Sequence, residues 1–193
     1  MRANCFSEEL NLIRSVKLRE FIVEFMEKFV PDYFYIVPAS SSGKYHPQYA
    51  LGEGGLVRHT KACVLIAEEL LSLAQNSHLP HDKIISALLI HDTFKQGLDT
   101  KGHTQFEHPL FSANAIRLFA KEYHPDMQET AEEIASLVLS HMGQWNTSPH
   151  SRLVLPTPQT EEQKFVHMCD YLASRKSIIV NVTYEPSEEE QQQ

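Results

Sequence analysis

The sequence places an imidazole beside a carboxylate at the end of an apolar run, where His91-Asp92 follows Leu88-Leu89-Ile90. Both groups lose their hydration if this run is buried, and a buried charge must be paired or bound to a metal ion. Four other residues offer the same kinds of ligand atom: His59, His108, His141 and Asp170. We predict that these six side chains converge on metal ions.

Imidazole and carboxylate groups suit Fe, Mn, Zn, Co or Ni, and the lack of a thiolate in the predicted set argues against copper(I) and iron–sulfur clusters. A carboxylate can bridge two ions about 3.5–4 Å apart, as in two-metal hydrolytic sites that activate a water and hold phosphoryl oxygens. Lys95 follows His91 by one helical turn and could neutralise a phosphate oxygen. These groups could therefore act together on a phosphoryl group.

The predicted ligands continue the apolar faces of predicted helices. His141 lies four residues after Leu137, and His59 precedes Cys63 by four, so each histidine shares a helix face with an apolar neighbour. Side chains from different helices can form a closed metal site in the core of a bundle. We expect the helices to hold the ligands and the loops between them to admit the substrate.

Apolar spacing and breaker residues predict about six helices. They run from Ser7 to Phe29, over 56–73, from Pro80 to Asp92, onward from Pro109, from after Pro125 to His141, and over 160–175. Long loops cover 32–53, 97–105 and 144–159, and residues 177–184 form a short strand or an extended arm. The predicted fold class is all-α, a single-domain helical bundle with long functional loops.

Composition restricts the class of protein. The chain has 193 residues, 42% hydrophobic and 22% charged, as in one soluble domain with a sizeable core. Its net charge of -8 argues against an extended nucleic-acid-binding surface. Three cysteines without a CxxC pair predict reduced thiols in a cytoplasmic protein. There is no apolar signal-peptide core and no apolar stretch long enough for a bilayer, so we expect no membrane association.

The order of His59, His91-Asp92 and Asp170 resembles the HD superfamily of metal-dependent phosphohydrolases, with Lys95 at the place of a lysine that often follows the His-Asp pair. The similarity extends over about residues 38 to 175, and includes segments similar to the HD module of bacterial 3′→5′ exoribonuclease-type proteins. The segments that carry it are 54–60, 106–113, 139–143, 155–158 and 167–173. Residues 38–176 are therefore expected to form an HD-type domain. Residues 1–37 would pack on it, and 177–193 would form an arm with a disordered tail.

The resemblance also implies roles for the predicted ligands. One ion would be held by His59, His91, Asp92 and Asp170, and a second by Asp92, His108 and His141. Asp92 would bridge the two ions and Lys95 would face the substrate phosphate, which makes these two the predicted catalytic residues. The implied reaction is hydrolysis of a phosphomonoester or phosphodiester by a metal-activated water. The implied cofactors are two divalent ions, from Fe, Mn, Ni, Co or Zn.

The sequence departs from the family pattern in two places. Thr93-Phe94 replaces the small Ile-Gly that commonly precedes the family lysine, and the bulk of Phe94 is expected to narrow the pocket. The chain also lacks the OB-fold that accompanies the module in the exoribonucleases, which argues against processive RNA binding. The expected substrate is therefore a small phosphorylated molecule, a nucleotide or a nucleic-acid end.

Several other residues are candidates for the site. Lys44, in the loop 40–44, and His150 with Arg152 are predicted to bind substrate anions, although a plain surface loop fits 40–44 equally well. His103 rivals His108 as a ligand, and Trp145 could stack on a base or pack beneath its own loop. The remaining histidines fit surface or structural positions better: His46, His78, His81, His124 and His167.

Two other functions fit the same residues. A diiron oxygenase on this fold would use a similar six-ligand set, and a non-catalytic nucleotide sensor would keep its metal ions for structure alone. The apolar stripe of Phe21, Phe25 and Phe29 fits a core face or an oligomer contact, so a homo-oligomer stays open.

Overall fold

The computed structural model describes residues 2–41, 43–44, 46–98 and 102–186, and within them it shows helices and no strand. The α-helices are α1 (Ser7–Asn11), α2 (Val16–Lys28), α3 (Gly55–Leu71), α4 (His81–Ile90), α5 (His108–Tyr123), α6 (Gln128–Leu139) and α7 (Glu161–Ala173). Short 3-10 helices lie at η1 (Arg2–Phe6), η2 (Asp32–Tyr35), η3 (Gln48–Ala50), η4 (Ala74–Asn76) and η5 (Pro125–Met127). The predicted all-α, single-domain bundle is confirmed.

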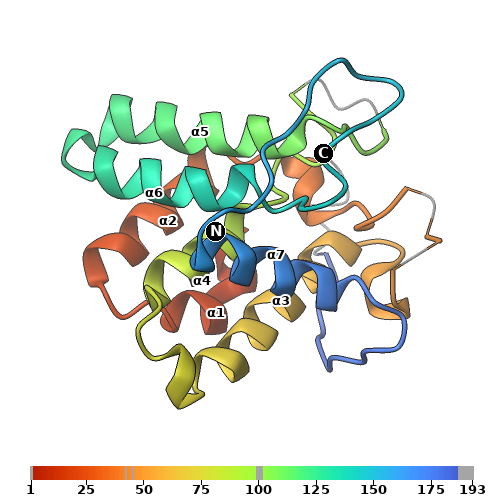
Figure 1. Cartoon of the computed structure of the whole chain (residues 1–193), viewed down its shortest axis with the longest axis horizontal. Coiled ribbons are helices and arrows are strands. Elements are labelled where there is room, and N and C mark those ends of the chain that lie inside the picture. The colour runs from red at the N-terminus through yellow and green to blue at the C-terminus, as the bar shows by residue number, and fades with distance from the viewer. Residues whose placement is uncertain (1, 42, 45, 99–101, 187–193) are drawn as a thin grey trace.

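The helices pack so that several of their ends meet near the middle of the bundle. In Figure 1, α5 and α6 run side by side, and α3, α4 and α7 lie below them. The α3 helix packs against both α4 and α7, and α4 also packs against α6. This arrangement brings the C-terminal ends of α4 and α6 close to the first residue of α5.

The first predicted helix is two helices, and this accounts for seven where about six were expected. The chain breaks between α1 and α2 at Ser15, whose hydroxyl oxygen accepts a hydrogen bond from the Leu18 N–H at 3.3 Å and so caps α2. The Ser15 N–H donates to Asp82 at 2.8 Å. Ser7, where the predicted helix begins, is the first residue of α1, and Phe6 takes the N-cap position.

Two glycines fix the start of α3. Gly54 precedes the helix with φ of +68°, a left-handed conformation that suits glycine. A Cβ atom on Gly55 would overlap the carbonyl oxygen of Ala50. The helix can therefore begin directly against the preceding loop, which places His59 one turn inside it.

The N-terminal segment belongs to the core. Phe21 and Phe25 of α2 are fully buried and pack against Phe119 of α5, with ring centroids 5.3 and 5.6 Å apart. Of the two alternatives for this stripe, the structure shows the core face. No described helix has the length and apolar character needed to cross a membrane.

The C-terminal residues form an extended arm. Residues 178–186 have no regular secondary structure, so of the two alternatives for 177–184 the structure shows the arm. The carbonyl oxygen of Tyr184 accepts a hydrogen bond from Arg58 of α3, whose guanidinium also donates to the carbonyl oxygens of Tyr49 and Leu51. The predicted disordered tail, 188–193, lies outside the described residues.

Candidate metal centre

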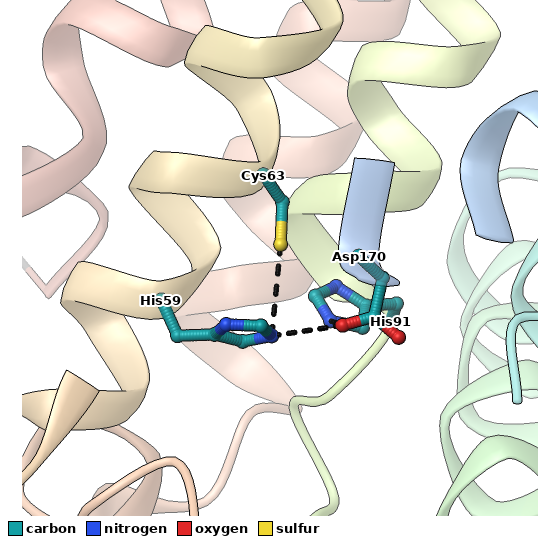
Figure 2. A group of neighbouring side chains, drawn as sticks. All are labelled: His59, Cys63, His91 and Asp170. Atoms are coloured by element: carbon teal, nitrogen blue, oxygen red, sulfur yellow. Dashed lines mark hydrogen bonds and ion pairs between the residues drawn. The ribbon is translucent and has the colours of Figure 1, made fainter. Parts of the chain in front are cut away.

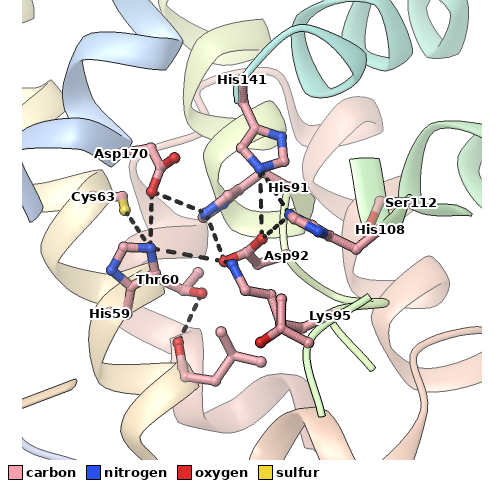
Figure 3. Close-up of polar contacts among 12 residues, drawn as sticks. His59, Thr60, Cys63, His91, Asp92, Lys95, His108, Ser112, His141 and Asp170 are labelled. Carbon is pink, nitrogen blue, oxygen red and sulfur yellow. Dashed lines mark hydrogen bonds and ion pairs between the residues drawn. The ribbon is translucent and has the colours of Figure 1, made fainter. Parts of the chain in front are cut away.

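The six side chains predicted to bind metal lie together. His59 comes from α3 and Asp170 from α7, while His91 and Asp92 directly follow α4, His108 begins α5 and His141 lies two residues after the end of α6. Five of these side chains are at most 1% exposed, and the side chain of Asp170 is 20% exposed. Figure 3 shows all six pointing toward one another, with Lys95 beside Asp92.

A first group of potential ligands surrounds His59. Its Nε2 atom lies 3.0 Å from Asp170 Oδ1 and 3.6 Å from the sulfur of Cys63, and His91 Nε2 lies 3.8 Å from the same Asp170 oxygen (Figure 2). One ligand atom from each of these four residues lies within 4.8 Å of all the others. A single ion could contact all of them.

A second group surrounds the other oxygen of Asp92. Asp92 Oδ1 lies 2.9 Å from His108 Nε2 and 3.5 Å from His141 Nε2. Asp92 Oδ2 faces the first group instead, 3.4 Å from His91 Nε2 and 3.8 Å from His59 Nε2. The two oxygens of one carboxylate thus face two different groups of nitrogen donors, as a bridging ligand requires.

The hydrogen bonds of three rings leave their Nε2 atoms as electron-pair donors. The Nδ1 atoms of His91, His108 and His141 each lie 2.7 Å from the carbonyl oxygen of the residue three positions earlier. Since a carbonyl oxygen only accepts, each Nδ1 carries a proton, and in the neutral form of each ring Nε2 carries a lone pair. Backbone carbonyls orient metal-binding histidines in this way.

Among the described residues, these lone pairs face no hydrogen-bond donor. His108 Nε2 and His141 Nε2 lie only 3.1 Å apart, and the buried His91 Nε2 has no hydrogen-bond partner among the described residues. Buried polar atoms are almost always satisfied, so an unpaired nitrogen and two facing acceptors require an explanation. Cations at these positions would satisfy them, so the side chains fit the metal ions predicted from the sequence.

The protonation states of His108, Asp92 and Asp170 also suit metal binding. Burial, reinforced by the ammonium group of Lys95, lowers the pKa of His108 to about 4 and keeps the ring neutral. Burial raises the pKa of Asp92, but Lys95 and the neighbouring histidines outweigh it and hold that pKa well below its usual range. Burial likewise opposes ionisation of Asp170, yet its hydrogen bond with His59 holds the Asp170 pKa low. A neutral imidazole and ionised carboxylates are the forms that bind metal.

A cavity of about 320 Å³ opens above the second group. Lys95 lies in its wall, and its Nζ atom donates to Asp92 Oδ2 at 2.6 Å. The other lining residues are Ala39, Ser40, Ser41, His46, His103, Thr104, His108 and Met142. The cavity lies within the range of small-molecule sites.

Several predicted site residues lie elsewhere. Lys44, His150 and Arg152 are exposed, and none of them lines this cavity. Phe94 does not narrow it either, because its buried side chain lines a separate apolar hollow with Phe29, Leu98 and Phe111. His103 lies in the cavity wall, outside both groups of ligands.

Two aromatic residues of α7 have partners near the centre. The ring of Trp145 stacks on Tyr171, with centroids 5.5 Å apart and planes 15° apart, although the tryptophan stays 43% exposed. His167 Nδ1 lies 2.7 Å from the carbonyl oxygen of His141, and its ring covers Gly143 so closely that a Cβ atom there would overlap it. His167 therefore has a structural position next to a candidate ligand.

Sequence reasoning missed the place of two residues. Cys63 lies in the first group of potential ligands, and its spacing of four from His59 is the signal that could have shown this. His46 lines the cavity, with its ring 5.5 Å from that of His59, and burial lowers the pKa of His46 to about 3. The loop position of His46 gave no comparable signal.

Comparison with known families gives a match to the HD domain. The model of the HD domain matches residues 56–175, which include all six predicted ligands. Comparison with curated proteins and with solved structures gives no match.

Proposed function

The chain belongs to the HD-domain family, and on this basis we propose that it is a metal-dependent hydrolase of phosphomonoesters or phosphodiesters. One observation carries the proposal: the carboxylate of Asp92 lies between two groups of nitrogen donors, one oxygen facing each group. Such an arrangement would suit a dinuclear hydrolytic centre, in which bound ions lower the pKa of water and withdraw charge from phosphoryl oxygens.

The residues of the chain supply the rest of the site. Asp92 would bridge the ions and keep them at a fixed separation. Lys95 is held by Asp92 at the wall of the cavity, where its charge can bind a phosphate oxygen and stabilise the negative charge that develops during hydrolysis. We propose these two as the catalytic residues, and Fe, Mn, Ni, Co or Zn as the ions, because imidazole and carboxylate ligands suit them.

The cavity supports a small substrate. At about 320 Å³ it can take a phosphate with part of a nucleotide. The net charge of -8 does not favour a long nucleic acid. We therefore propose a nucleotide or a nucleic-acid end as the substrate. Because Lys44, His150 and Arg152 lie outside the cavity wall, we propose no role for them at the reacting phosphate.

We propose residues 38–176 as the functional domain. The wall of the cavity begins at Ala39, and the last helix that carries a candidate ligand ends at Ala173. Residues 1–37 would serve as a supporting layer, since α2 contributes fully buried phenylalanines to the same core.

The test is a screen of metal-replete protein against generic phosphomonoesters, phosphodiesters and nucleotides. We expect phosphate release that is lost in Asp92→Asn and after chelation. Oxygen uptake without phosphate release, together with a mixed-valence iron signal in EPR spectra, would show a diiron oxygenase instead. No turnover of any substrate by fully loaded protein would favour a nucleotide sensor.

A further inference from the structure

We propose that the thiolate of Cys63 is a ligand of the first metal ion, which the six-residue set predicted from the sequence does not include. Cys63 lies on α3 one turn after His59, with its sulfur 3.6 Å from His59 Nε2. Figure 2 shows the sulfur, both imidazole rings and the carboxylate of Asp170 directed at one space. The inference rests on the metal centre of the proposed function but not on the reaction.

An independent observation points to a ligand in the same space. His91 is fully buried, and its ring is oriented by the hydrogen bond from Nδ1 to the Leu88 carbonyl oxygen. Within the part of the chain that the structure describes, its Nε2 atom has no hydrogen-bond partner. A ring nitrogen of His91 lies within 4.8 Å of the Cys63 sulfur, as do the ligand atoms of His59 and Asp170. One cation would therefore satisfy the orphaned nitrogen and contact the sulfur.

A second buried thiol shows that burial alone does not make a ligand. Cys169 is as buried as Cys63 and directly precedes Asp170, yet it is outside both groups of potential ligands. Among the described residues, the Cys63 sulfur has a hydrogen-bond contact with His59, which is itself a candidate ligand. Cys63 therefore differs from Cys169 in the position of its sulfur next to the other candidate ligands, and not in how deeply it is buried.

A thiolate would make the two ions unequal. It favours Zn and Fe over the harder Mg and Mn, which prefer oxygen ligands, and binding would release the thiol proton to solvent. The first ion would have ligands from Cys63 and the set His59, His91, Asp92 and Asp170, whereas the second would have three. Three protein ligands leave positions open for water or substrate, so the second ion would take the substrate phosphate.

X-ray absorption on the zinc-loaded protein tests the ligand directly. A thiolate gives a Zn–S distance of about 2.3 Å, separable from the Zn–N distance of about 2.0–2.1 Å for imidazole. We expect sulfur scattering in the wild-type protein and in Cys169→Ser, and its loss in Cys63→Ser. Absence of sulfur scattering from the wild-type protein would overturn the proposal, whether or not the variants fold, and so would its persistence in folded Cys63→Ser.

Metal preference gives a second readout. We expect Cys63→Ser to lower the affinity of the first site for Zn roughly 100-fold while changing that for Mn little, and Cys169→Ser to change neither. An equal loss for both metals would mean that Cys63 supports the fold rather than the ion. Neither measurement involves substrate. Zinc–sulfur bonds without phosphate release would therefore reject the proposed hydrolase but retain Cys63 as a ligand. Phosphate release without zinc–sulfur bonds would retain the hydrolase and reject Cys63 as a ligand.

Discussion

The Nε2 atoms of His108 and His141 lie 3.1 Å apart, although the Nδ1 atom of each ring already faces a backbone carbonyl oxygen. Two rings protonated at Nδ1 present lone pairs to each other, and Asp92 Oδ1 adds a third at 2.9 Å from His108. Buried acceptors that face one another in this way would be satisfied by a cation placed among them. The pair therefore has the properties of a metal site that the fold prepares in advance.

Removal of one of these rings should empty one site only. We expect His108→Ala to bind one ion per chain where the parent binds two, because the first group keeps its own ligands around His59. Elemental analysis after metal loading and gel filtration measures this. His103→Ala is the matched control, since His103 lies in the cavity wall outside both groups. Unchanged metal content in His108→Ala would refute the assignment of two sites.

Loss of the Lys95 charge should affect turnover more than metal content. Its ammonium group lies in the cavity wall, 2.6 Å from Asp92 Oδ2, but it is not a ligand. We expect Lys95→Met to lower kcat about 10²–10³-fold, the usual cost of removing one charge-stabilising group. Steady-state kinetics and elemental analysis measure the two effects on the same sample. The control is Lys83→Met, at a surface ion pair with Glu133, which should change neither kcat nor metal content. If Lys95→Met instead loses metal but keeps full activity per bound ion, Lys95 has a structural role.

Gly143 should tolerate no side chain. Its φ of +57° is left-handed, and a Cβ atom would overlap the ring of His167, which contacts the carbonyl oxygen of His141. We expect Gly143→Ala to lower the free energy of unfolding by about 1–3 kcal/mol and to weaken binding of the second ion. Urea unfolding and metal titration measure these effects.

Gly102 provides the control for that substitution. Its φ is +71°, but no atom of the other described residues lies within 4 Å of a Cβ atom there, so Gly102→Ala carries the backbone strain without the overlap. We expect Gly102→Ala to lower the free energy of unfolding less than Gly143→Ala does, and to leave metal affinity unchanged. Equal effects at Gly102 and Gly143 would mean that the contact with His167 has no part in holding His141.

Much of the fold could be predicted because the spacing of apolar residues along the chain indicates where the helices lie. Helices α3 to α7 follow apolar stripes that end at prolines, glycines or polar residues. The break between α1 and α2 could not be predicted in this way, because the backbone at Ser15 is held by Asp82, 67 residues away. Local signals cannot show a contact at that separation.

The candidate metal ligands could also be predicted from local sequence, but the loop residues around them could not. The candidate ligands stand out because each interrupts an apolar face with a group that needs a partner. Lys44, His150 and Arg152 lie in loops, and the side of the molecule that a loop faces depends on tertiary packing that spacing does not encode. Cys63 lies on the same face of its helix as His59. A buried thiol is ordinary in a protein core, so the residue type alone gave no reason to predict that Cys63 lies at the metal centre.

The metal-free protein should lose stability as the solution becomes more acidic. An unfolded histidine has a pKa of about 6.5, whereas burial and Lys95 lower the pKa of His108 to about 4. Between these values the unfolded chain binds a proton that the folded chain does not, so the free energy of unfolding falls as pH falls. From this residue we expect a loss of about 2 kcal/mol between about pH 7 and pH 5. Urea unfolding of chelator-treated protein measures it. His108→Gln should show a shallower dependence over the same range, and identical slopes would mean that His108 is protonated in the folded state.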